Sequence, residues 1–426
     1  MKKQNSKILI VGGGASGVLT AIALLRRGIP PEDIEIADPH ELGEGLAYQT
    51  TDAHHLLNVP TSKMSAIDSL PNDFVEWSNA QGYSFMQRRM YALYLKDRLG
   101  KSVKHVKDYV VNLEIDASNN YIATFGEGDK KTYQYIVLAM GHGQARLPDF
   151  LKDSKNCNRI IYDVWSGNVL PEMEQLLCFG TGLSFVDVAL SHLARSDKNR
   201  VIVISRSGNL PERHSLSAVE PFKPNIDDVS TLGKLRNYLN SAGDSWREAV
   251  DGLRPITEEM WINFTLTERE EFLRTDGSTW SRRRHRIAPE VADQLENEIK
   301  RGRLKVFSGT VKEITATDFD ITLHTREGES FKGDYLAITI GRDYQLSDPL
   351  TQNLIKNGFT TRGPLNMGLS VDISSATLKD LIGKNYSNIF ALGPLRSGEA
   401  FESTAIPEIR KQATQIAEKI SFSLTE

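Results

Sequence analysis

Short apolar runs alternate with segments of helical periodicity at the start of the chain. Lys7–Val11 is an apolar run rich in β-branched residues, and it has the length of a buried strand. Glycines follow it, and Ala15–Arg26 then places apolar residues at helical spacing. A second apolar run ends at Asp38. This order of strand, turn, helix and strand predicts an α/β fold of the dinucleotide-binding, Rossmann-like type.

The turn between the first strand and helix carries the pattern G-x-G-x-x-G at Gly12, Gly14 and Gly17. The first glycine of this pattern makes the tight turn, the second admits a pyrophosphate, and the third lets helix and strand pack closely. Asp38 stands where a carboxylate accepts hydrogen bonds from an adenosine ribose. The alternatives are a plain strand-to-helix turn and a turn initiated by Asp38-Pro39. The expected FAD contacts here are Gly12, Gly14, Ala15, Ser16, Gly17, Asp38 and Pro39.

The same pattern recurs in the middle of the chain. Leu176–Phe179 reads as a strand, Leu183–Leu193 as a helix and Val201–Ser205 as the next strand. Gly180 and Gly182 make the turn between the first two. Phe185 replaces the third glycine, so we expect helix and strand to pack further apart here.

The residues after this second unit indicate which nicotinamide nucleotide binds. An NAD site carries a carboxylate at the strand end, whereas this chain has Ser205 and Arg206. Arg206 suits the 2′-phosphate of NADPH, although NADH stays an alternative and Arg206 is alternatively a solvated charge. The expected NADPH contacts are Gly180, Thr181, Gly182, Leu183, Ser184, Ser205 and Arg206.

Composition narrows the class of protein. The chain has 426 residues, 40% of them hydrophobic, and a net charge of −4, which gives no reason to expect a nucleic-acid partner. Two cysteines argue against a disulfide framework. His54 and His55 lack a carboxylate or cysteine cluster, so we expect no metal. No apolar stretch reaches about 18 residues. We therefore expect a cytoplasmic protein without a membrane span.

Two dinucleotide units in one chain resemble the flavoproteins in which an NAD(P)H fold interrupts an FAD fold. Tyr135–Gly141 and Tyr335–Gly341 resemble the strand-end glycine motifs at the crossovers, and Asn388–Leu395 resembles the late strand that returns to the flavin. The whole chain is similar to a poorly characterised family of FAD/NAD(P)-binding proteins. The motifs that carry this similarity are Gly43–Ala66, Phe85–Leu95, Arg284–Glu290 and Leu392–Arg410. Gly180–Asp187 is more distantly similar to the flavin-dependent N-hydroxylating monooxygenases.

This resemblance implies two cofactors, FAD and NADPH, and further flavin contacts. It places Asn58 and Met64 near the isoalloxazine, with a loop that merely covers the cofactor as the equal alternative. Arg88 would reach the flavin pyrophosphate or the substrate pocket, or lie on a solvated helix face. The helix after Pro407 would point its N-terminus at the flavin or serve only as a packing helix. The remaining implied FAD contacts are Gly141, Gly393, Pro394, Ala405 and Ile406.

Residues 282–286 form the strongest positive cluster of the chain, and Arg284, His285 and Arg286 are our substrate candidates. The functional interpretation is capture of a carboxylate or phosphate by a bidentate arginine. The structural alternative is pairing with acidic residues just upstream, at 267–272.

We expect the FAD domain to comprise residues 1–165 and 300–426, and the NAD(P)H domain residues 166–299, with a helical lobe at about 230–297. The predicted function is an NADPH-dependent FAD monooxygenase that hydroxylates a small amino-acid-like or amine substrate with O₂ through a flavin hydroperoxide. The alternatives are a reductase or oxidase that passes electrons to a quinone or protein, and a flavin-binding sensor without turnover. Cys157 and Cys178 do not form a Cys-x-x-Cys pair, which argues against a dithiol reductase.

Overall fold

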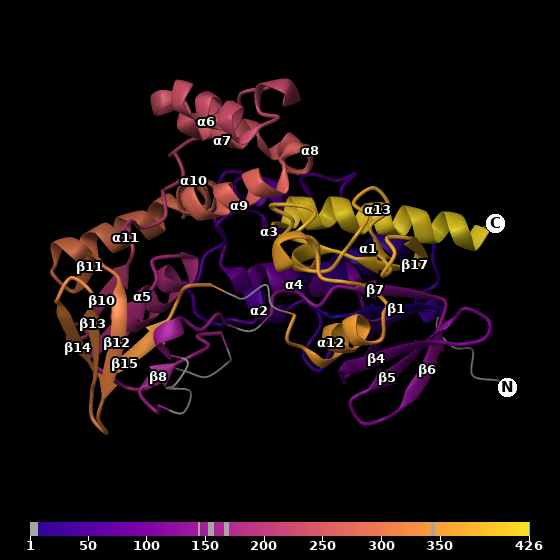
Figure 1. Cartoon of the computed structure of the whole chain (residues 1–426), viewed down its shortest axis with the longest axis horizontal. Coiled ribbons are helices and arrows are strands. Elements are labelled where there is room, and N and C mark those ends of the chain that lie inside the picture. The colour runs from indigo at the N-terminus through magenta and orange to yellow at the C-terminus, as the bar shows by residue number, and fades with distance from the viewer. Residues whose placement is uncertain (1–6, 144, 152–156, 166–169, 342–345, 426) are drawn as a thin grey trace.

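The computed structural model describes residues 7–143, 145–151, 157–165, 170–341 and 346–425. Two parallel sheets lie at opposite ends of the molecule, and a helical lobe sits above the region between them (Figure 1). The predicted fold class, two Rossmann-like dinucleotide-binding folds, is confirmed. Among the described residues, no helix is both long and apolar enough to cross a membrane.

The first sheet has the strand order β16-β17-β7-β1-β2-β3, and only β16 runs antiparallel to its neighbour. Ile8 of β1 pairs with Ile34 of β2 and with Tyr135 of β7. All four residues of β1 are buried, as expected for a parallel strand covered on both faces. The strands are β1 (Ile8–Val11), β2 (Ile34–Ala37), β3 (Lys104–Val106), β7 (Tyr135–Leu138), β16 (Thr377–Lys379) and β17 (Asn385–Ala391).

Alternate residues of β1 belong to different cores because successive side chains of a strand point to opposite faces. Ile8 and Ile10 pack with α1 (Ala15–Arg26), α3 (Asp73–Ser78), α4 (Arg88–Leu99) and α13 (Ile406–Thr425). Leu9 and Val11 pack with a three-stranded meander and α12 (Pro349–Lys356). The meander strands are β4 (Val110–Ile115), β5 (Tyr121–Phe125) and β6 (Lys130–Tyr133).

The second fold repeats this plan. Its parallel sheet has the order β11-β10-β9-β15-β8, with α5 (Leu183–Arg195) and α11 (Pro289–Lys300) packed on one face. A second antiparallel meander precedes β15, as the first precedes β7. The strands are β8 (Ile160–Ile161), β9 (Gln175–Phe179), β10 (Arg200–Ser205), β11 (Leu304–Ser308), β12 (Val311–Ala316), β13 (Ile321–Thr325), β14 (Ser330–Gly333) and β15 (Tyr335–Ile338).

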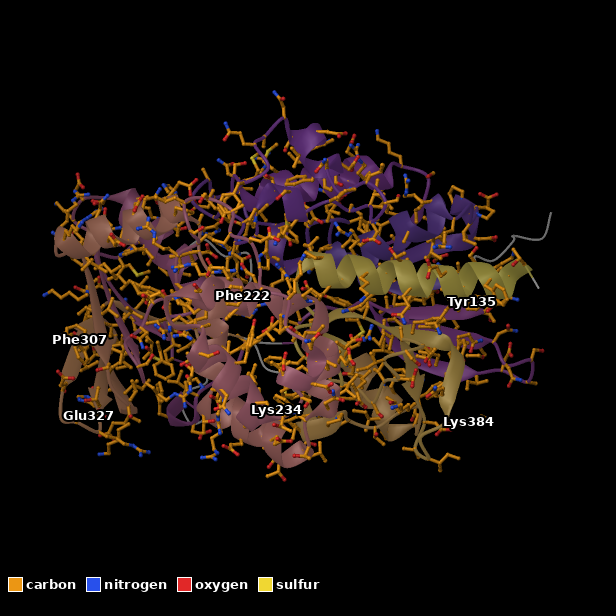
Figure 2. The ribbon with its side chains drawn as sticks, turned by 90° about the horizontal axis from the view of Figure 1, so that it is seen from above. Tyr135, Phe222, Lys234, Phe307, Glu327 and Lys384 are labelled. Carbon is orange, nitrogen blue, oxygen red and sulfur yellow. The ribbon has the colours of Figure 1, made fainter. Side chains whose placement is uncertain are left out.

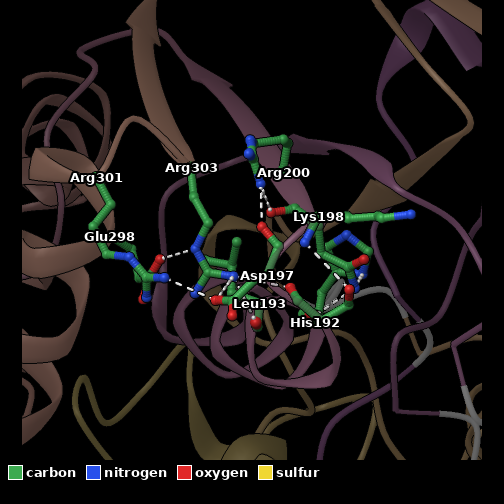
Figure 3. A network of polar contacts seen from close by, with 10 residues as sticks. His192, Leu193, Asp197, Lys198, Arg200, Glu298, Arg301 and Arg303 are labelled. Atoms are coloured by element: carbon green, nitrogen blue, oxygen red, sulfur yellow. Dashed lines mark hydrogen bonds and ion pairs between the residues drawn. The ribbon is translucent and has the colours of Figure 1, made fainter.

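A buried arginine fixes the end of α5 in this fold (Figure 3). Arg303 Nη1 donates to the carbonyl oxygens of Leu193 at 3.1 Å and Ser196 at 2.9 Å, and its Nε donates to Glu298 Oε2 at 2.5 Å. The last carbonyls of a helix lack partners within the helix, and a cation there also complements the helix dipole. The contact therefore anchors the helix that begins at the second glycine turn.

The helical lobe spans the two folds. Its own core is aromatic, and Phe401 of the C-terminal segment stacks on Trp261 at 4.6 Å between ring centroids. Figure 2 shows Lys234 of the lobe between Phe307 at the second fold's end and Tyr135 at the first fold's end. The lobe helices are α6 (Leu232–Ser241), α7 (Trp246–Gly252), α8 (Thr257–Asn263), α9 (Leu266–Thr275) and α10 (Gly277–Arg284).

The strand pairing corrects the predicted domain limits. β11 and β15 pair with β10 and β9, so residues 304–338 belong to the second fold, although 300–426 was assigned to the FAD domain. β8 at 160–161 also pairs with β15. In addition, α11 packs in the core of the second fold and lies outside the lobe. The prediction failed because these pairings join strands that are far apart in sequence.

Candidate dinucleotide and substrate sites

The first glycine turn is as tight as its sequence predicts. Gly12 has φ +105°, and a β-carbon there would lie 2.5 Å from the Ala139 carbonyl oxygen. A β-carbon at Gly17 would lie 1.9 Å from the Gly12 carbonyl oxygen. Gly14 is the N-cap of α1, and within the described residues no side chain caps that helix. The N-terminus of α1, with Ala15 as its first residue, therefore suits an anionic group.

Asp38 follows β2 directly and lies against this turn. Its Oδ2 accepts from the Gly13 amide at 2.6 Å, and its Oδ1 accepts from the His40 amide at 2.8 Å across Pro39. The second bond is the contact expected of a turn that begins at Asp38-Pro39. The first places the carboxylate next to the glycine turn, where a ribose hydroxyl is expected. The residues present thus fit an adenine dinucleotide.

The C-terminal segment meets the same turn. A β-carbon at Gly393 would lie 3.3 Å from Ser16 Oγ, although the two residues are far apart in sequence. Gly393 and Pro394 open the 3₁₀ helix η8 (Gly393–Arg396), and both are buried. The Gly393 amide donates to Gln412 Oε1 of α13 at 2.8 Å. α13 begins at Ile406, directly after Ala405. The structure therefore brings FAD candidates from both ends of the chain together.

The other flavin candidates are more dispersed. Met64 is 1% exposed and belongs to the core of the first fold. The Asn58 carbonyl accepts a hydrogen bond from His214 Nε2 at 3.0 Å. Gly141 has φ +72° in the first crossover, and the crossovers meet where the Arg146 amide donates to the Gly341 carbonyl at 3.2 Å. Flavin contact by Asn58, Met64 and Gly141 stays a prediction.

Arg88 requires a correction. It begins α4, and its side chain is not solvated, because only 13% of it is exposed. Arg88 Nη2 pairs with Asp187 Oδ2 of α5 at 2.7 Å, and its Nε donates to the Leu56 carbonyl at 3.1 Å. These contacts place Arg88 at the junction of the two folds and rule out the solvated helix face, whereas contact with the flavin pyrophosphate or the substrate pocket stays a prediction. Its partner Asp187 could not be predicted from the sequence, because the two residues lie in different folds.

The second glycine turn reproduces the first. Gly180 has φ +106°, and a β-carbon there would lie 2.9 Å from the Thr339 carbonyl oxygen, as Gly12 faces Ala139. Gly182 is the N-cap of α5 and, among the described residues, receives no side-chain cap. Phe185, at the position of the third glycine, is fully buried in the core of this fold. An aromatic side chain therefore fills the place where the first fold requires glycine.

The residues around this turn form a small polar network. Thr181 Oγ1 donates to Ser205 Oγ at 3.0 Å, and Ser205 Oγ accepts from the Gly208 amide at 3.0 Å. Leu183 begins α5, and the next residue, Ser184, accepts from the Trp165 indole at 3.1 Å. Arg206 follows β10 and is exposed. An exposed arginine at the carboxyl end of this strand is compatible with both the NADPH and the solvated interpretation.

The arginine cluster pairs with acidic residues, but not with those upstream. Arg284 Nη2 lies 3.3 Å from Glu408 Oε1, and its Nε lies 3.8 Å from Glu402 Oε2. His285 Nε2 lies 3.1 Å from Glu402 Oε2, and Arg286 pairs with Asp251. The expected partners at 267–272 are engaged elsewhere; Glu268 caps α9 and Glu271 pairs with Arg236. The C-terminal segment therefore supplies the counter-charges of Arg284 and His285, while Asp251 of α7 supplies that of Arg286.

Glu402 is the central acceptor that the sequence analysis missed. Its side chain is 7% exposed, and it also accepts from the Trp280 indole at 2.8 Å. His285, Arg284 and Trp280 outweigh the effect of burial and lower the pKa of Glu402. A buried, ionised carboxylate thus ties α10 of the lobe to the segment that leads into α13.

Comparisons with known proteins agree with this architecture. Residues 9–143 match the model of a family described as FAD-NAD(P)-binding. The uncharacterised protein YdhS of Escherichia coli (strain K12) is 23% identical over 269 residues, which cover 51% of this chain and 48% of that protein. The chain thus spans about half the length of this curated relative.

Solved structures match over nearly the whole chain. The reduced ornithine hydroxylase of Pseudomonas aeruginosa has a TM-score of 0.65 at 15% identity, covering 98% of this chain and 99% of that one. The FAD-bound cadaverine monooxygenase of Erwinia amylovora has a TM-score of 0.66 at 11% identity, covering 97% and 94%. The bacillithiol disulfide reductase of Staphylococcus aureus has a TM-score of 0.61 at 14% identity, covering 98% of both chains. The chain therefore has the fold of flavoproteins with two dinucleotide-binding domains.

Proposed function

We propose that this protein is an FAD- and NADPH-dependent oxidoreductase, and within that class a monooxygenase of a small amine or amino-acid-like substrate. The observation that carries the proposal is the repetition of one glycine turn, at Gly12 against Ala139 and at Gly180 against Thr339. Two such turns in one chain supply one site for each dinucleotide. FAD, when bound, supplies the hydride-accepting and oxygen chemistry, so no side-chain nucleophile is required.

The roles of the chain's own residues follow from their positions. The N-termini of α1 and α5 would each receive a pyrophosphate, and Asp38 would bind the ribose of FAD. Arg206 would bind the 2′-phosphate of NADPH. Gly393 and α13 would close the flavin site from the C-terminal side.

A reductase is the second candidate, since bacillithiol disulfide reductases share the fold. Thiol–disulfide exchange through a pair of cysteines needs both thiols to be accessible, and here Cys178 is fully buried while Cys157 is partly exposed. Burial also raises the pKa of the Cys178 thiol, which disfavours the reactive thiolate. This observation favours the monooxygenase over a dithiol reductase. A reductase or oxidase that passes electrons to a quinone or protein is the alternative that remains. We keep the expectation of a cytoplasmic location as part of the proposal.

The test is to add NADPH to the FAD-loaded protein without oxygen and then to admit oxygen while recording the flavin spectrum. We expect rapid bleaching, followed by oxygen consumption coupled to hydroxylation when amines and amino acids are screened. Bleaching with uncoupled return to oxidised flavin across the screen would support the reductase or oxidase. No bleaching by either nicotinamide nucleotide would contradict the proposal and support the sensor.

Gly180→Val provides the matched control. Its side chain would enter the space next to the Thr339 carbonyl, in a backbone conformation that β-branched residues avoid. We expect the variant to keep FAD and its reduction by dithionite while losing reduction by NADPH.

A further inference from the structure

Trp165 makes hydrogen bonds to residues of both folds. On the side of the second fold, its indole Nε1 donates to Ser184 Oγ at 3.1 Å, in the first turn of α5. On the side of the first fold, its carbonyl oxygen accepts from Gln49 Nε2 at 2.8 Å. A single residue therefore connects the start of the second fold's first helix with the loop that follows the flavin-side glycine turn.

Gln49 is close to that turn through the helix that precedes it. It directly follows α2 (Gly45–Tyr48), and a β-carbon on Gly45 would lie 2.9 Å from the Gly14 α-carbon. The helix thus packs against the backbone that is expected to receive the flavin pyrophosphate. The first fold therefore holds the Trp165 backbone from a point next to its own dinucleotide site.

The first fold also holds the ring of Trp165. His55 packs against the indole in a T-shaped arrangement, with 5.5 Å between ring centroids, and the Arg88 guanidinium lies over it at 5.3 Å. Arg88 is itself fixed by its ion pair with Asp187 of α5. The indole is thus oriented on several sides, and its N–H is directed at Ser184.

The hydrogen bond from the indole leaves the Ser184 hydroxyl available as a donor. A serine hydroxyl has one hydrogen to donate and two lone pairs that accept. The indole occupies one lone pair, and among the described residues the hydroxyl hydrogen has no acceptor. A hydroxyl that accepts a hydrogen bond also becomes a stronger donor. Ser184 is partly exposed and follows the second glycine turn, where the free amides of α5 favour an anion.

We propose that Trp165 is a positioning residue of the second dinucleotide site, and that it directs the Ser184 hydroxyl at the pyrophosphate of the nicotinamide nucleotide. This inference rests on the proposed function, which assigns NADPH to that site. Without the indole, the serine hydroxyl is free to bond to nearby backbone carbonyls instead. Trp165 acts on the pyrophosphate, which NADP⁺ and NAD⁺ share, whereas Arg206 would act only on the 2′-phosphate of NADP⁺.

Titration calorimetry of the FAD-loaded protein with NADP⁺ and with NAD⁺ tests the inference without turnover. Trp165→Phe keeps an aromatic ring and the backbone carbonyl but removes the N–H. We expect it to weaken the binding of both nucleotides by the same factor, about 3–10-fold, which corresponds to the loss of one hydrogen bond. Trp77→Phe is the matched control, because the Trp77 indole donates to Asp97 Oδ2 at 3.1 Å within the first fold. This control should bind both nucleotides as the parent does.

Ser184→Ala tests whether Trp165 acts through the serine. Alone it should weaken both nucleotides as much as Trp165→Phe does, and the double variant should bind no more weakly than either single variant. Ser184→Thr keeps a hydroxyl and should keep most of the affinity. Flavin content and thermal unfolding show which variants keep the fold, and Ser184→Ala leaves the contacts of Trp165 with the first fold in place. Unchanged binding by either single variant, or a further loss in the double variant, would overturn the inference.

The inference and the proposed function fail in different ways. If the parent protein binds neither nucleotide, the proposed function falls and the inference falls with it. If the parent and all variants bind the nucleotides equally, only the inference falls. A loss in Trp165→Phe that is restricted to NADP⁺ would locate the effect at the 2′-phosphate, and it would also overturn the inference.

Discussion

Arg88 Nη2 lies 2.7 Å from Asp187 Oδ2, and the two side chains are only 13% and 7% exposed. This ion pair joins the first helix turn of α4 in one fold to α5 in the other. Trp165 lies beneath the guanidinium at 5.3 Å, and Ser191 of α5 donates to Asp52 Oδ2 at 2.5 Å beside it. The relative position of the two folds, which a hydride transfer between their cofactors requires, thus depends on a buried polar junction.

We expect Arg88→Met to destabilise the protein by about 3–5 kcal/mol, because it leaves the Asp187 carboxylate buried without its counter-charge. Urea unfolding measures the free energy. The double variant Arg88→Met/Asp187→Leu should recover much of the loss, since it removes both charges. A single variant as stable as the parent would show that the junction carries no such role.

Gly17→Ala should cost about 2 kcal/mol or more and lower the amount of bound FAD, because the new β-carbon would meet the Gly12 carbonyl at 1.9 Å. Gly233→Ala is the matched control, since Gly233 lies in α6 with open space around it. There the same change should raise stability by about 0.4–1 kcal/mol. Thermal unfolding measures the stability, and flavin absorbance measures the bound FAD. If the two variants changed equally in stability and in bound FAD, the close contact at Gly17 would be contradicted.

Acid should destabilise the fold through His214. Burial and the nearby Arg286 lower the pKa of His214 to about 4. The unfolded chain, with a histidine pKa near 6.5, then binds more protons between these values, so stability is complete above pH 6.5 and falls as the pH drops toward 4. We expect about 2 kcal/mol to be lost between pH 7 and pH 5. His214→Gln keeps an N–H donor toward the Asn58 carbonyl but cannot titrate. Urea unfolding at pH 7 and at pH 5 should therefore show that the variant lacks this part of the loss in unfolding free energy.

Arg206→Ala should raise KM for NADPH about 10-fold or more and leave KM for NADH unchanged, because only NADPH carries the 2′-phosphate. Stopped-flow reduction of the flavin by each nucleotide gives the ratio. Arg326→Ala, at an exposed turn of the second fold, is the control for loss of a surface charge. Equal losses for both nucleotides would mean that Arg206 does not select between them.

Local features of the fold could be predicted from the sequence, and long-range ones could not. The helices that begin at Ala15 and Leu183 start at the predicted residues, because glycine turns and apolar periodicity are encoded locally. The limit of the second fold was wrong, since β11 and β15 reveal their membership only by pairing with distant strands.

The candidate site shows the same division. The arginine cluster was recognised from its spacing, but its partners Glu402 and Glu408 come from the C-terminal segment.

The insertion of one fold into the other sets an order for synthesis on the ribosome. β7 ends at Leu138, yet its neighbour β17 and the helix α13 that covers α1 follow only at 385–425. At 5–20 residues per second, the roughly 280 intervening residues take about 15–60 s to emerge. Throughout this interval the apolar face of α1, including Leu19 and Ile22, lacks the cover of Ile409 and Ile416. The second fold can close first, and the half-built first fold is the intermediate that a chaperone would have to protect.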